Sequence, residues 1–268
     1  MHLTDPLPAQ SDLSSDLTVE QRGAVMIVTL KRAAKRNALN DGLILALEHV
    51  FTHLPEGTRA AVIAGAGEHF CAGLDLSELE QRSTIDGLHH SRMWHRAFNA
   101  IEKGSVPVVA ALHGAVVGGG MELAGSCHIR VADETAFFAF PEGTRGIFVG
   151  GGGSVRAPKL IGEHRMLDMM LTGRVYKATE AVPVGFAQYL VPAGTALTNA
   201  LELAQRIASN TPMTNYALMH ALPRIAEQSA DHGFFTEALM ASIVETAPEA
   251  QARVKDFLEG RGAKVKAG

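Results

Sequence analysis

The chain has 268 residues, of which 47% are hydrophobic and 19% charged, and its formal net charge is −4 at pH 7. These values predict a globular protein of one large domain, or one domain with an appendage, that can bury a sizeable core. The acidic balance, without a basic stripe, disfavours a protein that binds nucleic acid by neutralising its phosphates.

The two cysteines, Cys71 and Cys127, lie among apolar or small residues and have no CxxC spacing. They indicate neither a disulfide framework nor a zinc site, and they favour reduced thiols in a cytoplasmic protein. The N-terminal stretch MHLTDPLPAQSDLSSD lacks both the basic region and the apolar region that are typical of a secretory signal. No apolar run reaches the roughly 18 residues of a membrane span. We therefore expect a soluble protein without a membrane partner.

Four apolar runs bounded by turn residues predict strands at 24–30, 60–65, 106–112 and 128–132. After the first of these, Asn40 is suited to cap a helix, because apolar residues recur at helical spacing from Leu43 to Leu54. Strands that alternate with helices need crossover connections, so this order predicts an α/β fold.

From about Pro192 onward the strand pattern stops. Four amphipathic segments predict helices at 195–210, 213–225, 234–246 and 248–260. We therefore expect three parts, which are a flexible N-terminal segment at 1–18, an α/β core at 19–192 and a C-terminal helical region at 193–268.

Two loops rich in small residues each stand between a predicted strand and a helix. They are GEHFCAGLDLSEL at 67–79 and HGAVVGGGMELAG at 113–125. Because a helical glycine costs roughly 1 kcal/mol against alanine, three in a row indicate that the backbone must be bare there. Bare N–H groups backed by a helix N-terminus can form an oxyanion hole. The alternative is that the small residues only let a helix pack closely on the sheet.

A third glycine stretch, RGIFVGGGGSVRAPKLIG at 145–162, follows Glu142. It lacks the GxxxxGK[ST] of a phosphate-binding loop, and its loose match to a dinucleotide fingerprint lacks an early strand with an acidic partner. Two acids, Glu122 and Glu142, remain beside apolar residues and glycine-rich backbone. Two carboxylates with differently tuned pKa values suit general acid–base chemistry, whereas either one alone would be interpreted as a solvated glutamate.

Four stretches in this order resemble the enoyl-CoA hydratase/isomerase (crotonase) family. They are KRNALN at 35–40, FCAGLDL at 70–76, GAVVGGGMELAGSCHIRVA at 114–132 and FPEGTRGIFVGGGG at 140–153. The resemblance covers about 23–191 and implies a spiral of repeated β-β-α units. The helical tail fits that family's trimerisation region, so a homotrimer or a dimer of trimers is expected.

The resemblance implies an acyl-CoA thioester whose carbonyl oxygen lies between two backbone N–H groups that stabilise an enolate. By their places in the motifs, these groups belong to Leu74 and Gly119. Glu122 would orient and deprotonate water, and Glu142 would deliver a proton to the α-carbon. The residues implied to contact the substrate and its CoA moiety are Lys35, Arg36, Ala38, Ala72, Asp75, Leu76 and Gly150.

Coenzyme A is then part of the substrate, and no separate cofactor or metal is expected. His89, His90 and His95 do not place three ligands on one helical face, so we interpret them as surface or pocket-lining residues. They lie in the segment at 83–98, which is expected to form part of the acyl pocket, and Trp94 is expected to serve in packing. Val149 and Phe140 depart from the family's pattern and predict a more apolar pocket.

Because both acids are present, the resemblance favours an enoyl-CoA hydratase, a hydro-lyase of fatty acid metabolism. One alternative is an isomerase or a hydratase-lyase of the same superfamily that acts on an aromatic or branched acyl-CoA. Another is a scaffold that binds CoA or RNA without catalysis. The two glutamates argue against lost chemistry, and the acidic net charge argues against RNA.

Overall fold

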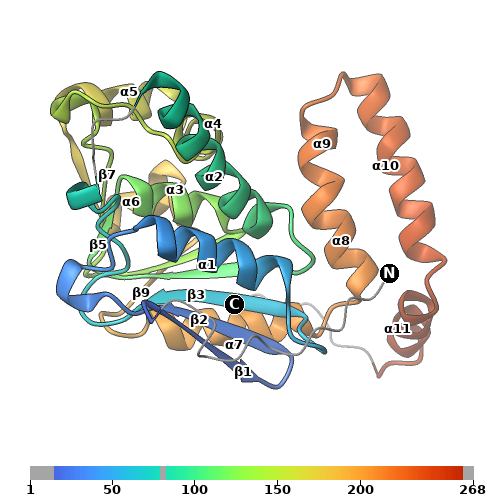
Figure 1. Cartoon of the computed structure of the whole chain (residues 1–268). Coiled ribbons are helices and arrows are strands. Elements are labelled where there is room, and N and C mark those ends of the chain that lie inside the picture. Colours follow the sequence, from blue (N-terminus) through green and yellow to red (C-terminus); the bar gives the residue numbers. More distant parts are fainter. Residues whose placement is uncertain (1–14, 79–82, 262–268) are drawn as a thin grey trace. The chain divides into compact units, whose positions relative to one another are not determined.

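The computed structural model describes residues 15–78 and 83–261. A six-stranded sheet lies at the centre of the first compact unit, which extends to Ala208 (Figure 1). Its strands, in spatial order, are β1 (Leu17–Arg22), β2 (Val25–Leu30), β3 (Ala60–Gly65), β4 (Val108–Leu112), β6 (Ile129–Asp133) and β9 (Tyr189–Val191). β1 and β2 pair antiparallel, and every other neighbouring pair in this sheet is parallel.

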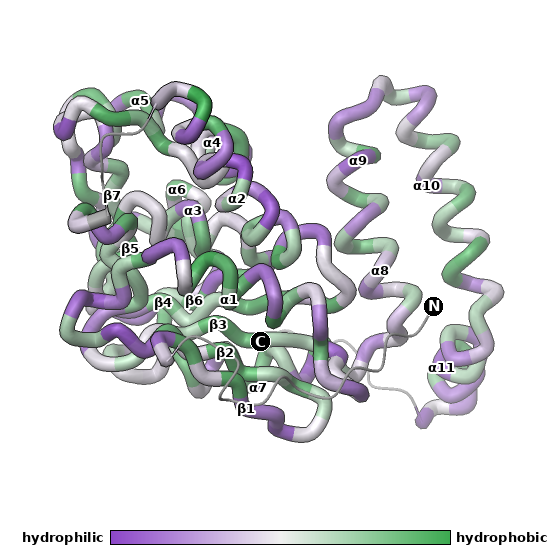
Figure 2. Tube along the Cα trace, viewed as in Figure 1, coloured by the Kyte–Doolittle hydropathy of each residue, from purple (hydrophilic) through white to green (hydrophobic). Residues whose placement is uncertain are grey.

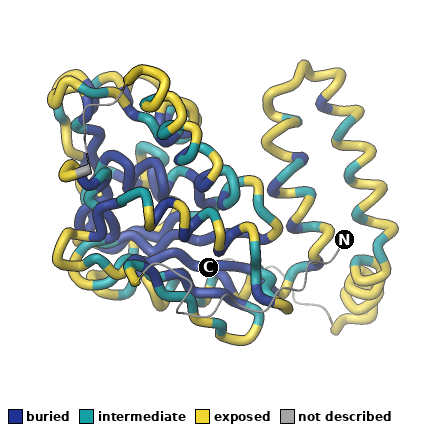
Figure 3. Tube along the Cα trace, viewed as in Figure 1, coloured by how far each residue is buried: buried dark blue, intermediate teal, exposed yellow. Residues whose placement is uncertain are grey.

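The central strands are buried on both faces, as the hydropathy and burial colouring shows (Figures 2 and 3). In β4, Val108 and Ala110 face one hydrophobic core, whereas Val109 and Ala111 face a second. This alternation follows from the two-residue repeat of a strand. A parallel sheet with two covered faces appears in the sequence as continuous apolar runs. The four predicted strands are accordingly found within two residues of their expected bounds.

Helices cover the two faces of this sheet. One face carries α1 (Asp41–Thr52), α2 (Thr84–Glu102) and α3 (Gly119–Ser126), and the other carries α7 (Ala196–Ala208). The predicted cap of α1 is confirmed, because Asn40 Oδ1 accepts a hydrogen bond of 2.8 Å from the Leu43 N–H. The buried face of α7 consists of four alanines at every fourth position, which are Ala196, Ala200, Ala204 and Ala208.

A second sheet contains β5 (Ala115–Val117), β7 (Phe137–Ala139) and β8 (Val175–Lys177). The order β4, β5, α3 is followed by β6, β7 and α4 (Gly153–Ile161), so the arrangement of two strands and a helix occurs twice in succession. α5 (Glu163–Thr172) and α6 (Ala178–Val184) complete the unit, together with the short 3-10 helices η1 (Ala33–Lys35), η2 (Leu76–Glu78) and η3 (Gly143–Arg145).

The second compact unit begins at Ser209, and all of its described secondary-structure elements are helices. It contains α8 (Pro212–His220), α9 (Leu222–Ala226), α10 (Ala230–Glu245) and α11 (Pro248–Leu258). The helix predicted at 213–225 is divided at Ala221, two residues before Pro223, which lacks a backbone N–H.

The boundary between the two units differs from the one expected at 192. It lies after Ala208, because the alanine face of α7 packs on the sheet and joins that helix to the first unit. Leu17 and Thr18, which were expected to belong to a flexible N-terminal segment, are the first residues of β1. Residues 1–14 of that segment lie outside the described part. Within residues 15–78 and 83–261, no helix is long and apolar enough to cross a membrane.

Candidate active site

A cleft of about 370 Å³ opens in the first unit between α2, the start of α3 and the loop that follows Glu142. Five residues that the resemblance assigned to catalysis or substrate contact line it, which are Leu74, Gly119, Glu122, Glu142 and Gly150. They come from three of the four motif stretches, at 70–76, 114–132 and 140–153. The fold therefore brings together the two expected N–H donors and both expected acids.

The backbone around Leu74 directs one N–H group away from the neighbouring segment. Leu39 and Leu74 form an isolated parallel bridge, in which the Leu39 N–H donates to the Gly73 carbonyl at 2.7 Å. The Asp75 N–H donates back to the Leu39 carbonyl at 2.8 Å. Leu74 itself therefore turns its N–H away from Leu39, and it has no hydrogen-bond acceptor among the residues that the structure describes.

Gly119 offers a second such group, because it is the first residue of α3 and its N–H has no place in the helical hydrogen-bond ladder. The preceding residue, Gly118, has a φ of 52°, a conformation that glycine adopts without strain. A Cβ atom on Gly73 would lie 3.3 Å from the Gly119 nitrogen, so the two backbone segments are in contact. Two adjoining N–H groups at one cleft can bind a developing oxyanion.

Glu122 is 3% exposed, and its Oε1 accepts hydrogen bonds from the N–H groups of Gly151 at 2.8 Å and Gly153 at 2.7 Å. The pKa of this carboxyl is raised from 4.5 to about 7, chiefly by burial and also by the charge of Glu142. The two glycine N–H groups and the Arg156 charge act in the opposite direction. Glu122 can therefore exchange a proton near neutral pH.

Glu142 follows β7 and precedes η3, and it is 8% exposed. Burial raises the pKa of its carboxyl above the usual range, although the Arg145 charge opposes the shift. Its Oε1 lies against Gly118, whereas Oε2 is buried without a hydrogen-bond partner in the described part of the chain. An acid in this state is suited to hold a proton and to give it to a bound molecule.

Six of the expected CoA contacts come together beside the cleft, where the loop at 35–39 is hydrogen-bonded to residues 72–75. The Ala72 N–H donates to the Arg36 carbonyl at 2.9 Å, and Lys35 Nζ lies 3.7 Å from Asp75 Oδ1. The Ser77 hydroxyl and the Arg32 guanidinium hold the pKa of Asp75 well below its usual range. The six residues of this group are Lys35, Arg36, Ala38, Ala72, Asp75 and Leu76. Gly150 lies apart from them, in the cleft.

Sequence reasoning missed the two residues that hold Glu122. Gly151 and Gly153 belong to the third glycine stretch, and that stretch was their only signal. Trp94, expected to serve in packing, contacts Phe98 edge to face with ring centroids 5.7 Å apart, and it also lines the cleft. His90 lines the cleft as well and pairs with Asp41 at 2.7 Å. The expected wall at 83–98 therefore lies on α2.

Two other groups bear on the chemistry. Burial raises the pKa of the Cys71 thiol to about 12, so it is not a thiolate near neutral pH. Among the described residues, no group of three or more histidine, cysteine, aspartate or glutamate side chains is arranged to hold a metal ion.

Proteins of known family share both the sequence and the fold. The family model for enoyl-CoA hydratase/isomerase matches residues 20–267. A crystal structure of a protein assigned as an enoyl-CoA hydratase from Rhodopseudomonas palustris is 55% identical, with a TM-score of 0.90 over 94% of this chain and 97% of that one. The short-chain-enoyl-CoA hydratase of Clostridium acetobutylicum is 34% identical over 74% of this chain and 77% of its own length. The 2,3-dehydroadipyl-CoA hydratase of Escherichia coli is 32% identical over 92% and 97%, respectively.

The family match spans both compact units, and the structural match covers nearly the whole of both chains. The resemblance drawn from the four motifs and the crotonase-like α/β fold are therefore confirmed. With its two acids and two backbone N–H groups at one cleft, the chain is a crotonase-superfamily enzyme and belongs to the enoyl-CoA hydratase/isomerase family.

Proposed function

We propose that this enzyme adds water across the 2,3 double bond of an acyl-CoA thioester. The observation that supports this reaction is the meeting of two buried carboxylates, Glu122 and Glu142, with the N–H groups of Leu74 and Gly119, which have no acceptor in the described part of the chain, at one cleft. Isomerisation needs only one acid to move a proton, whereas hydration uses one acid at each carbon of the double bond.

In the proposed reaction, the thioester carbonyl oxygen accepts hydrogen bonds from the Leu74 and Gly119 N–H groups. Glu122 takes a proton from water as the water oxygen bonds to the β-carbon. The electron pair of the double bond moves toward the thioester, and the two N–H groups stabilise the enolate oxygen. Glu142 gives its proton to the α-carbon, and the carbonyl re-forms. Proton return from Glu122 to Glu142 through solvent completes the addition of one water molecule.

This division of labour requires Glu122 to be ionised and Glu142 to be protonated when the substrate binds. Their surroundings differ in the required sense, because two N–H groups stabilise the Glu122 carboxylate, whereas Glu142 Oε2 has no described partner. We expect the rate to rise with pH as Glu122 ionises near its pKa of about 7, and to fall as Glu142 loses its proton.

The same cleft suggests where the two ends of the substrate lie. We propose that the CoA phosphates face Lys35 and Arg36 and that the acyl group lies among Trp94, Phe148 and Val149. The apolar character of these three side chains supports an acyl chain without charge near the double bond. The named relatives act on a short-chain enoyl-CoA and on 2,3-dehydroadipyl-CoA, so chain length is the property to be measured.

The test is a panel of thioesters, in which loss of the absorbance of the conjugated double bond is followed and the products are identified. We expect crotonyl-CoA or a longer 2-enoyl-CoA to yield the 3-hydroxyacyl-CoA. Conversion of a 3-enoyl-CoA without hydration would identify an isomerase, and release of an aromatic aldehyde from a hydroxycinnamoyl-CoA would identify a hydratase-lyase. Binding of CoA thioesters without turnover of any would favour the scaffold instead.

A further inference from the structure

A buried arginine lies behind the glycine turn that holds Glu122. Arg156 is in the first turns of α4 and is 8% exposed. Its Nη1 donates to the Gly151 carbonyl at 3.0 Å, and its guanidinium lies so close over Gly152 that a Cβ atom there would clash with Nη1. The side chain thus folds back over the turn from which α4 begins.

The other guanidinium nitrogens bind α2. Arg156 Nε donates to Glu102 Oε2 at 2.8 Å, and Nη2 donates to Asn99 Oδ1 at the same distance. Because the guanidinium is planar and rigid, three partners in fixed directions determine its position. Arg156 therefore ties the Gly151 carbonyl to the end of α2.

The turn that Arg156 contacts is built from glycine and has an unusual backbone conformation. Gly152 has a φ of 100°, a left-handed conformation that lets the N–H groups on either side of it point to one oxygen, Glu122 Oε1. A run of four glycines, 150–153, has more backbone freedom than any other sequence of that length. An external contact to the turn limits this freedom and so favours the common direction of the two N–H groups.

We propose that Arg156 is a positioning residue for Glu122. Through the Gly151 carbonyl it holds the turn so that both N–H groups stay directed at the carboxylate, and its positive charge favours the ionised form. The inference rests on the proposed function, in which ionised Glu122 takes the proton from water.

Other charged and titratable groups lie near Glu122 and would remain if Arg156 were removed. Across the cleft, Glu142 opposes ionisation of Glu122 and raises its pKa. On α2, Glu102 is paired with Arg156. Also on α2, burial and the Arg156 charge lower the pKa of His95, which is hydrogen-bonded to the Gly150 backbone. Removal of Arg156 takes away a positive charge that lowers the pKa of Glu122, so this pKa should rise.

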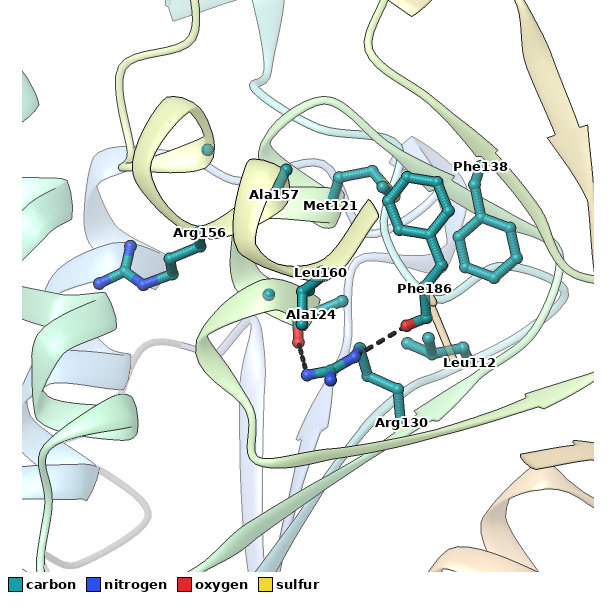
Figure 4. Close-up of a pocket in the computed structure, with 11 residues that line it drawn as sticks. Leu112, Met121, Ala124, Arg130, Phe138, Arg156, Ala157, Leu160 and Phe186 are labelled. Carbon is teal, nitrogen blue, oxygen red and sulfur yellow. Dashed lines mark hydrogen bonds between the residues drawn. The ribbon is translucent and has the colours of Figure 1, made fainter. Parts of the chain in front are cut away.

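The experiment compares Arg156→Met and Arg156→Lys with a matched control, Arg130→Met. Arg130 is also a buried arginine, 4% exposed, but its hydrogen bonds go to the carbonyls of Phe186, Ala124 and Cys127, outside the glycine turn. Figure 4 is a close-up of a small pocket that both arginines line, and it shows the Arg130 guanidinium reaching Ala124 and Phe186, whereas the Arg156 guanidinium points in another direction. Arg156→Met and Arg130→Met each lose a buried, hydrogen-bonded guanidinium, so a general loss of stability should affect these two variants alike.

The first readout is the pH profile of kcat/KM for the active thioester. We expect Arg156→Met to move the acidic limb upward by about one pH unit, so that activity falls about tenfold more at pH 6 than at pH 9. Arg156→Lys keeps the charge but not the three directed bonds, and it should show a smaller shift in the same direction. Arg130→Met should lower the melting temperature and leave the limb in place. An unmoved limb in both Arg156 variants, or an equal shift in Arg130→Met, would overturn the proposal.

The second readout does not depend on turnover. An infrared titration follows the protonated carboxyl band, and the component that Glu122→Gln removes is assigned to Glu122. That component should titrate at a higher pH in Arg156→Met, or in Arg156→Lys if the methionine variant does not fold. A shift of the band in an enzyme that hydrates none of the thioesters would refute the proposed reaction and retain the role of Arg156. An unshifted band in an active enzyme would refute the role of Arg156 alone.

Discussion

The carboxylate of Glu142 lies directly against the bare α-carbon of Gly118, where a Cβ atom would stand 2.5 Å from Oε1. The next two glycines meet different neighbours, because a Cβ on Gly119 would lie 2.9 Å from the Trp94 ring, and one on Gly120 would clash with the Cys71 carbonyl. Each glycine of the triplet therefore has its own reason to lack a side chain.

Gly118→Ala should displace the Glu142 carboxylate, because the added methyl group takes the place of Oε1 and the positive φ adds strain of about 1–2 kcal/mol. We expect a loss of about 10²-fold in kcat, comparable to removal of a general acid. The matched control is Gly125→Ala, in the same helix, where the new Cβ would meet only Arg156 Cβ at an ordinary 3.6 Å. Steady-state kinetics and melting curves compare the two, and equal activity would contradict this role of Gly118.

Gly119→Pro removes the N–H group that we assign to the enolate oxygen, but it also introduces a Cβ beside Trp94. Gly119→Ala introduces the same Cβ and keeps the N–H, so it is the reference. Proline is well tolerated at the first helical position. Relative to the alanine variant, we expect the proline variant to lose about 10²–10³ in kcat. Similar kcat values in two folded variants would exclude Gly119 as a donor.

Glu122→Gln and Glu142→Gln should each reduce hydration by at least about 10²–10⁴, because each acid takes part in proton transfer. The two should differ in exchange of the α-proton with solvent, which needs the acid at the α-carbon but no attacking water. Glu122→Gln should therefore retain more exchange, measured by deuterium incorporation into an acyl-CoA, than Glu142→Gln. Equal loss of exchange in the two variants, or full hydration activity in either one, would contradict these roles of the two acids.

Stability should also depend on Glu122 in a way that pH reveals. Its pKa is about 7 in the folded chain and near 4.5 when solvated, so between these values the folded state binds more protons than the unfolded state. Stability should therefore fall as pH rises through this window and stay level above it. The separation corresponds to at most about 3 kcal/mol. We measure the free energy of unfolding in urea at pH 4 and pH 8. The difference between Glu122→Gln and the wild type should change in favour of the variant by up to this amount from pH 4 to pH 8. An equal difference at both pH values would show that the group titrates normally.

We expect a trimer or a dimer of trimers in solution. Four large apolar side chains of α10 are exposed in the single chain, namely Phe234, Phe235, Leu239 and Ile243. Contacts between copies would remove this surface from water. Light scattering at micromolar concentration measures the mass, and the double variant Phe234→Glu with Phe235→Glu should shift it toward the monomer. A monomeric wild type would contradict the expectation.

The strands that could be predicted are those whose residues are buried on both faces. β3 and β4 are continuous apolar runs, whereas β1 is an edge strand in which polar residues follow Leu17 and Val19. β5, β7 and β8 have three residues each, too few for any periodicity to appear. Their existence depends on pairing with distant segments, which local sequence does not encode.

The candidate site also contains residues that local sequence reveals and contacts that only the fold reveals. The motifs locate Glu122 and Glu142, because residue types and spacing within a stretch are visible in the sequence. The contacts from Gly151 and Gly153 to Glu122 span 29 and 31 residues and use only backbone N–H groups, which every residue except proline has. The third glycine stretch marks a bare backbone, but only the folded chain shows which side chain it meets.

The small side chains on the alanine face of α7 let this helix pack closely on the sheet. It packs against β3 and β4, whose carboxyl ends lead into the loops that carry Leu74 and Gly119. A larger residue at Ala200 or Ala204 would push the helix outward or bend those strands, and both N–H groups would move with the strand ends. We therefore expect a larger side chain at either alanine to lower catalytic efficiency, although it is added on the far side of the sheet from the substrate.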